Sequence, residues 1–242
     1  MNSGDNQFTR PRGASEGTVV SVDPRRPHPL AILLPLCAVM LVWSAIRPYA
    51  YKDWFFEVAL GVAALAVLTA TRRRFPFSTV VYVLVGIYFA VMCAGGKYTY
   101  ALNPWFDWLR EVWLKPAFGW DRNYFDRVSH FLQGFVPAII AREVFLRTTP
   151  LRPGKMLNFL CISVCLAASA LYEIIEWWTV LLFYPGNGEQ WLGMQGDVWD
   201  AQWDMFTCLA GATLSIGFLS RRHTRSMARL PLSKDIAAKL VA

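Results

Sequence analysis

The chain has 242 residues, of which 55% are hydrophobic and only 17% charged, and its mean hydropathy is +0.32. This composition excludes an ordinary soluble domain of that size and indicates an integral membrane protein. The formal net charge is +7, but the basic residues gather at the ends of apolar segments, so they predict an orientation in a membrane and no nucleic-acid partner.

Residues 1–29 are polar, rich in Gly, Ser, Pro and Arg, and without periodicity. We expect them to form a disordered cytoplasmic tail. Arg25 and Arg26 precede an apolar run, as in a twin-arginine signal, but the prolines on either side of the pair fit such a signal poorly. The run 30–46 is also long for the apolar part of a signal peptide, which favours an uncleaved first span.

Six apolar segments are long enough to cross the hydrocarbon of a bilayer, which takes roughly 20 helical residues. We therefore predict an all-α, polytopic membrane protein with a six-helix membrane domain over residues 30–222. Residues 223–242 are expected to form a cytoplasmic C-terminal tail, in which Leu230 to Ala242 have the pattern of a short amphipathic helix. The expected spans are residues 30–46, 54–71, 77–95, 126–147, 156–183 and 198–220.

Basic residues follow the second span, separate the fourth span from the fifth, and follow the sixth. If the six spans alternate in direction, all of these residues fall on the same side as the basic N-terminal tail. The positive-inside rule places that side in the cytoplasm, together with both termini. The outer side then carries the loops 47–53, 96–125 and 184–197.

The connection 96–125 contains one candidate helix that does not cross the membrane. Asn103 and Pro104 form a good helix start, and an apolar, tryptophan-rich face follows them. We predict an amphipathic helix that lies in the outer interface of the membrane, where tryptophan is favoured. A lid packed on the protein is an equally good interpretation. The face is formed by Trp105, Trp108, Leu109, Val112 and Trp113.

The five cysteines all lie inside apolar segments, and none has the spacing of a zinc ligand. We expect them to be buried as small hydrophobic side chains, without disulfides. They are Cys37, Cys93, Cys161, Cys165 and Cys208.

Ionisable side chains enter the fourth and fifth spans from the outer side. Asp126 and His130 are four residues apart and share a helical face, with Gln133 beside them. Glu173 and Glu176 are one turn apart in the fifth span, on the order of 10–16 Å below its outer end. A charge at that depth costs roughly 3 kcal/mol or more, so the two glutamates need a reason to be there.

The sixth span adds an acidic stripe, because Asp197, Asp200 and Asp204 follow one another at helical spacing. Asp197 is expected at the water boundary, whereas Asp200 and Asp204 reach the depth of the two glutamates. With Asp126, these residues give six carboxylates against His130 and Arg127 as internal partners.

Such an excess of acid cannot stay fully ionised in a low-dielectric site, so a cation or protonated acids are expected. Carboxylates with one imidazole suit Zn, Mn, Mg or Ca, and spacing does not choose between these ions. The expected ligands of a divalent cation are His130, Glu173, Glu176, Asp200 and Asp204. The alternative is a structural network of protonated acids hydrogen-bonded to Gln133, Gln195 and Gln202.

Three motifs carry a resemblance to a known family. They are Asp126 to Phe131 (DRVSHF), Tyr172 to Trp177 (YEIIEW) and Gln195 to Asp204 (QGDVWDAQWD). In combination, over most of the region from the first span to Arg222, they resemble the YjdF-type inner-membrane proteins of bacteria, a family of unknown function. This resemblance implies a multi-pass protein of the bacterial inner (plasma) membrane.

The layout is more distantly similar to the VanZ-like proteins, which are associated with resistance to glycopeptide antibiotics. The matching residues are Asp126, His130, Glu173, Glu176, Asp204 and Gly211. Cys208 stands where the VanZ-like pattern has Asn, and this departure weakens a transfer of the VanZ-like role.

The first functional hypothesis is a metal-dependent hydrolase or transferase that acts on a lipid or lipid-linked envelope substrate at the outer leaflet. Its catalytic residues would be His130, Glu176 and Asp204. Its substrate-binding residues would be Asp126, Gln133, Trp177, Gln195, Asp197, Trp199 and Gln202. The partners expected are membrane lipids.

Two hypotheses from other classes stay open. The same acids are suited to a proton or cation relay in a transporter, although the six spans show no inverted repeat. The third hypothesis is a non-catalytic scaffold or binding protein of the envelope, in which the acids only hold three helices together.

Overall fold

The computed structural model describes residues 28–183, 186 and 192–241, and within these ranges it contains helices and no strands. The predicted all-α fold is therefore confirmed for the described part of the chain. Most of the expected disordered tail and part of the 184–197 loop lie outside the described residues. Six described helices have 16 or more residues: α1 (Leu30–Ala45), α2 (Tyr51–Thr71), α3 (Thr79–Tyr98), α6 (Phe125–Thr148), α7 (Lys155–Phe183) and α9 (Asp200–Met227).

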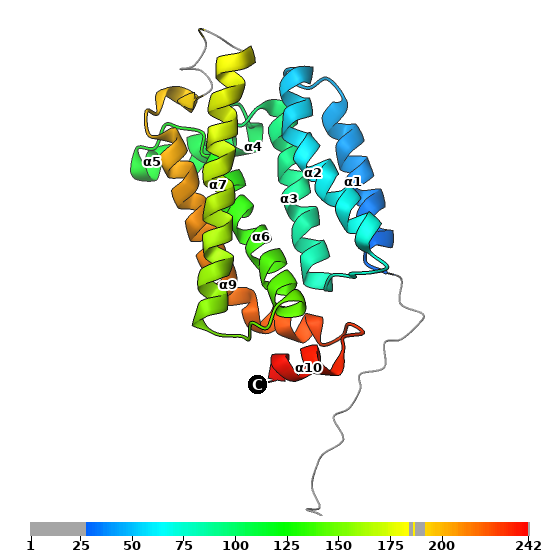
Figure 1. The fold of residues 1–242 in the computed structure, drawn as a ribbon. Coiled ribbons are helices and arrows are strands. Elements are labelled where there is room, and N and C mark those ends of the chain that lie inside the picture. The colour runs from blue at the N-terminus through cyan, green and yellow to red at the C-terminus, as the bar shows by residue number, and fades with distance from the viewer. Residues whose placement is uncertain (1–27, 184–185, 187–191, 242) are drawn as a thin grey trace, which may run out of the picture.

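The six long helices run alternately up and down, so their connections gather at two ends of the bundle (Figure 1). We call one end the basic end, because it carries Arg72, Arg152 and Arg221. We call the other the acidic end, because Asp126 and Asp200 lie there, where α6 and α9 begin. The start of α1 and the C-terminal helix α10 (Lys234–Val241) both lie at the basic end (Figure 1).

Three of the described helices, α2, α3 and α7, are long and apolar enough to cross a membrane, and α1 is apolar but shorter. The other two long helices, α6 and α9, are not among these candidates, because polar and charged side chains lower their mean hydropathy. Their charged side chains include Asp126 and Asp204, which are only 3% and 4% exposed. These two helices therefore direct the aspartates of their first turns into the bundle.

The close contact between α6 and α9 depends on two glycines. A Cβ atom on Gly134 would lie 1.8 Å from the carbonyl oxygen of Cys208, and one on Gly211 would lie 2.0 Å from the carbonyl oxygen of Phe131. One turn further along α9, towards the basic end, the Ser215 hydroxyl donates a hydrogen bond of 2.6 Å to the carbonyl oxygen of Phe135. Small residues at such a crossing let two backbones touch, as is common between membrane helices.

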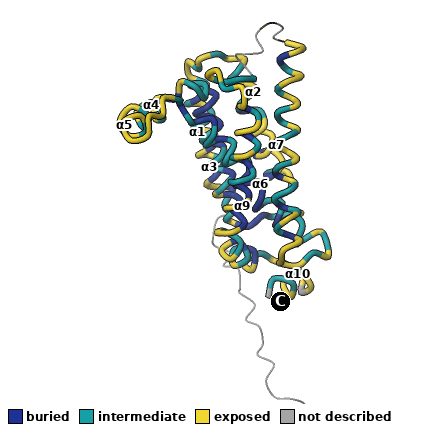
Figure 2. Tube along the Cα trace, turned by 90° about the vertical axis from the view of Figure 1, so that its left-hand side faces the viewer, coloured by how far each residue is buried: buried dark blue, intermediate teal, exposed yellow. Residues whose placement is uncertain are grey.

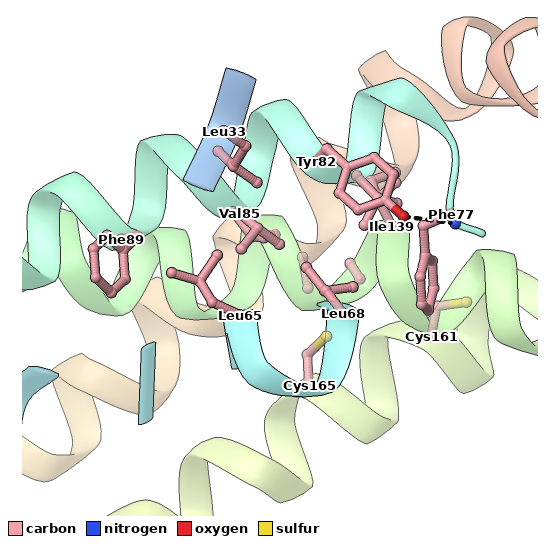
Figure 3. Close-up of a cluster of buried hydrophobic side chains, with 14 of the residues drawn as sticks. Leu33, Leu65, Leu68, Phe77, Tyr82, Val85, Phe89, Ile139, Cys161 and Cys165 are labelled. Atoms are coloured by element: carbon pink, nitrogen blue, oxygen red, sulfur yellow. Dashed lines mark hydrogen bonds between the residues drawn. The ribbon is translucent and has the colours of Figure 1, made fainter. Parts of the chain in front are cut away.

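The hydrophobic core fills the space between the helices. Leu33 of α1, Leu65 of α2 and Val85 of α3 pack together, and Ile139 of α6 joins the same cluster (Figure 3). The five cysteines are buried and free, as predicted. The outward helix faces are exposed although they are apolar (Figure 2), with Phe218 on α9 as a clear example.

Helix α9 continues through His223 to Met227, past residue 222, where the sequence suggested the end of the membrane domain. Both His223 and Met227 are fully buried, so this last part of α9 is packed against the bundle. The short C-terminal helix is present as α10, and Lys239 in it donates a hydrogen bond of 2.9 Å to the carbonyl oxygen of Thr149.

The predicted amphipathic helix is divided into α4 (Pro104–Leu109), a π-helical turn (Arg110–Leu114) and α5 (Lys115–Phe118). The side chain of Asn103 caps its start by accepting a hydrogen bond from the backbone N–H of Phe106. None of its residues is buried, and the segment projects from the bundle (Figure 2). This geometry does not support the alternative of a lid packed on the protein.

We expect Gly211→Ala to destabilise the protein, because the new Cβ would collide with the backbone of α6. Overpacking usually costs about 1–3 kcal/mol. Thermal unfolding in detergent measures the effect. Gly217→Ala, on the same helix but with no atom near the new Cβ, is the control and should change little. Equal unfolding temperatures for the two variants would show that the α6–α9 contact is not as close as described.

Candidate functional site

Two arginines and four aspartates form an ion cluster at the acidic end. Arg122, in the connection before α6, contacts Asp126 through Nη2, and the same atom lies 2.8 Å from Asp200 Oδ1. Its Nη1 atom lies 3.1 Å from Asp197 Oδ2. We refer to Arg122, Asp126, Arg127, Asp197, Asp200 and Asp204 as the ion cluster.

Arg127, in the first turn of α6, contacts the same carboxylates and, in addition, Asp204. Its Nη2 atom lies 2.6 Å from Asp200 Oδ1 and 3.1 Å from Asp197 Oδ2, and its Nη1 atom donates to Asp204 Oδ1. Arg127 is 11% exposed and Asp204 is 6% exposed, measured on their side chains. The guanidinium groups therefore join the first turns of α6 and α9 through charge-assisted hydrogen bonds that are shielded from water.

The segment before α9 is held against the connection before α6. The side-chain amide of Gln195 donates to the carbonyl oxygen of Asn123 at 2.8 Å and accepts from the N–H of Asn123 at 3.0 Å. The backbone N–H of Met194 donates to Asp200 Oδ2 at 3.0 Å. Both residues at the turn, Gln195 and Gly196, have positive φ. The turn thereby brings Asp197 back over the two arginines.

Below the ion cluster, one side chain from each of three helices converges. Ligand atoms of His130 (α6), Glu173 (α7) and Asp204 (α9) all lie within 4.8 Å of one another. His130 Nε2 is 3.4 Å from Asp204 Oδ2, the carboxylate oxygen that Arg127 does not contact. Among the described residues, His130 Nδ1 and Glu173 Oε1 are buried without a hydrogen-bond partner. We call these three residues the donor triad.

The donor triad borders a cavity of about 470 Å³ between α2, α3, α6, α7 and α9. His130 and Asp204 line it directly, together with Asp126, Gln133 and Glu176. The predicted face of α6 is thus confirmed, since Asp126, His130 and Gln133 all face one cavity. Aromatic and aliphatic side chains such as Phe56, Leu60 and Phe89 form much of the opposite wall.

The structure adds two polar residues that the sequence did not single out for the site. Glu57 of α2 lines the cavity and accepts a hydrogen bond of 2.7 Å from the Tyr100 hydroxyl. Glu57 was recognisable as an acid inside an apolar segment, but it stands alone there. Arg122 precedes Asp126 by one helical turn in the sequence, and nothing local indicated that it also reaches Asp197 and Asp200 of the last span.

The remaining predicted residues are not all brought to the cavity. Asp200 pairs with both arginines, and Asp197 lies at the rim with 24% of its side chain exposed. Glu176 lines the cavity but is outside the donor triad. Four predicted substrate-binding residues are exposed and do not line it: Trp177, Gln195, Trp199 and Gln202.

Comparison with known proteins gives two matches. Residues 29–225 match the family described as "Predicted membrane protein (DUF2238)". Inner membrane protein YjdF of Escherichia coli (strain K12) is 40% identical over 194 residues, which cover 80% of this chain and 90% of that protein. No solved structure matches. The family match includes the whole ion cluster and the donor triad.

We expect Arg127→Gln to destabilise the protein by about 3–5 kcal/mol, because it leaves buried carboxylates without one of their two cationic partners. Unfolding in detergent provides the measurement, and Arg127→Gln combined with Asp204→Asn should recover part of the loss. Lys115→Gln is the control. It breaks an exposed ion pair of 2.8 Å, in which the hydrogen bond from Lys115 holds the pKa of Asp121 below its ordinary value. If both single variants unfolded alike, the ion cluster would not be a stabilising element.

Proposed function

The chain belongs to the DUF2238 family of predicted membrane proteins, and from this premise we propose that it crosses the inner membrane six times and binds a divalent cation through the donor triad. The bound cation serves a hydrolase or transferase reaction on a lipid or lipid-linked substrate. The observation that carries the proposal is the convergence of His130, Glu173 and Asp204 beside a cavity inside the bundle.

The proposed topology rests on the alternation of the six long helices and on the distribution of charge. Arg72, Arg152 and Arg221 lie at the basic end, which the positive-inside rule assigns to the cytoplasm. Burial of the charged faces of α6 and α9 against each other makes these two helices compatible with a membrane. The α4–α5 segment, with exposed Trp108 and Trp113, then lies in the outer interface.

The cation is supported by the balance of charge in the site. Arg122 and Arg127 supply two positive charges to the four aspartates of the ion cluster. No described Arg or Lys forms an ion pair with Glu173 or Glu176. A divalent cation between His130, Glu173 and Asp204 would offset part of this excess. Oxygen and imidazole ligands at roughly 2.0–2.4 Å from such an ion lie up to about 4–5 Å apart, which is the spacing of the donor triad.

The reaction is supported by what surrounds the donor triad. A three-residue ligand set leaves coordination positions for water and substrate. Glu176 of α7 lines the same cavity and serves as the general base that takes a proton from the attacking water. The apolar wall at Phe56, Leu60 and Phe89 provides a surface for the hydrocarbon part of a lipid substrate.

Transport is a weaker interpretation of the same acids. Between the cavity and the buried polar residues Arg142, Glu143 and His223, the two helices pack buried apolar side chains, among them Ile139, Ala212 and Ile216. A proton or ion relay through the protein needs polar groups across that layer. The arrangement therefore favours a site that is open towards one end only.

The proposed topology predicts that the two ends of the bundle react on opposite sides of the membrane. Cysteine introduced at the exposed position Asp121 should be labelled by a membrane-impermeant thiol reagent in intact spheroplasts. Cysteine at the exposed position Arg152 should be labelled only after permeabilisation. The five native cysteines are buried and serve as an internal background. Labelling of both positions from one side would contradict an even alternation of the spans.

The proposed site predicts that the detergent-purified protein retains about one equivalent of a divalent cation after loading with Mn²⁺, Zn²⁺, Mg²⁺ or Ca²⁺ in separate samples. Glu173→Gln should weaken retention at least tenfold, because it removes one charged ligand of three. Metal analysis by mass spectrometry provides the measurement. Glu57→Gln is the matched control, since it neutralises a carboxylate on the cavity wall outside the donor triad.

The proposal fails if the folded wild-type protein retains none of the four ions. It also fails if Glu57→Gln and Glu173→Gln lose the ion equally, because the cation would then respond only to the general negative charge of the cavity.

A further inference from the structure

A second pocket, of about 540 Å³, lies at the basic end, far along α6 and α9 from the donor triad. It is lined by Arg142 of α6, the turn before α7, the first turn of α7 and the last turns of α9. Its lining includes Arg142, Gly154, Asn158, Arg221, Thr224 and Arg225, and it contains no Asp or Glu among the described residues. We call it the basic pocket.

Arg142 is the unusual member of the basic pocket, because it is charged and only 3% exposed. Its Nη1 atom lies 2.8 Å from His223 Nδ1, and its Nη2 atom donates to the Thr224 hydroxyl at 2.9 Å. Its Nε atom is buried without a hydrogen-bond partner among the described residues. Within the described part of the chain, no carboxylate lies within ion-pair distance of this guanidinium group.

The neighbouring Glu143 does not fill this role, because its two oxygens are already used. The backbone N–H of Ser78 donates to Glu143 Oε1 at 3.0 Å and to Glu143 Oε2 at 3.2 Å. Arg147 Nη1 lies 2.9 Å from Oε1. His223 Nε2 lies 2.9 Å from Glu143 Oε2. Since a guanidinium group only donates, His223 Nδ1 accepts from Arg142 and Nε2 carries the proton that faces Glu143.

The groups around Arg142 add positive potential. Arg221 and Arg225 are one turn apart on α9, and both are exposed at the pocket. The first turn of α7, which begins at Lys155 next to Gly154, presents the positive end of a long helix dipole. A buried guanidinium group without a carboxylate partner is costly, so a bound anion would stabilise this end of the bundle.

We propose that the basic pocket binds a phosphate group, either on a lipid head group or as free phosphate. Arginine side chains bind phosphate oxygens through paired N–H donors, and Ser220 and Thr224 add hydroxyl groups in the same lining. Basic pockets between membrane helices are known to bind anionic head groups. This inference does not depend on the cation site, which lies at the other end of α6 and α9.

The test compares wild type with Arg221→Gln/Arg225→Gln, because both residues are exposed and their loss does not disturb the buried network. The matched control is Arg222→Gln/Arg229→Gln, which removes two exposed charges outside the pocket. One arm measures the unfolding temperature of the detergent-purified protein against added inorganic phosphate, with chloride at equal ionic strength as reference. The other arm counts retained lipids by native mass spectrometry after reconstitution in phosphatidylcholine nanodiscs with and without phosphatidic acid.

We expect binding in at least one arm for wild type and for the control, weakened about tenfold or more in Arg221→Gln/Arg225→Gln. Stabilisation by inorganic phosphate identifies free phosphate as the source, and selective retention of phosphatidic acid identifies a lipid head group. The proposal is overturned if wild type binds in neither arm, or if the control loses binding as much as the pocket variant.

Discussion

Four aspartates share two guanidinium groups inside a bundle whose outer faces are apolar, and the positions of α6 and α9 depend on that pairing. Arg127 reaches from the first turns of α6 to Asp200 and Asp204 of α9, and Arg122 adds the connection before α6. Such groups are tolerated in an apolar interior only when they are paired. Because Arg127 takes one oxygen of Asp204, the other oxygen faces His130 and the cavity.

The ion cluster requires that the two helix backbones be close, and Gly134 and Gly211 allow this approach. The same helix pair then carries polar groups at both of its ends. At the acidic end it contributes His130 and Asp204 to a cavity, and at the basic end it places Arg142 of α6 against His223 of α9. The α6–α9 pair thus forms the polar axis of the molecule, while α1, α2, α3 and α7 supply most of its apolar surface.

The sequence predicted the six long helices well, because each contains a largely apolar stretch with charged or turn-forming residues near its ends, although α6 and α9 also carry charged side chains within it. Helical spacing also placed Asp126, His130 and Gln133 on one face, because that relation is local. The partners of Arg122 were not predictable, since they are set by a tertiary contact between distant segments. Trp177 follows Glu176 directly in the sequence, so its side chain points about 100° away around the axis of α7. The motif from Tyr172 to Trp177 therefore brings Glu176 to the cavity but not Trp177.

The proposed function depends on His130, Glu173 and Asp204 binding one cation together. Pulsed electron paramagnetic resonance of the Mn²⁺-loaded protein in nanodiscs tests this most directly, because the nitrogen nucleus of a coordinating imidazole modulates the Mn²⁺ signal. We expect nitrogen coupling from His130 in wild type and its disappearance in His130→Ala. A wild-type spectrum of Mn²⁺ coordinated only by water, or nitrogen coupling that survives in His130→Ala, would contradict it.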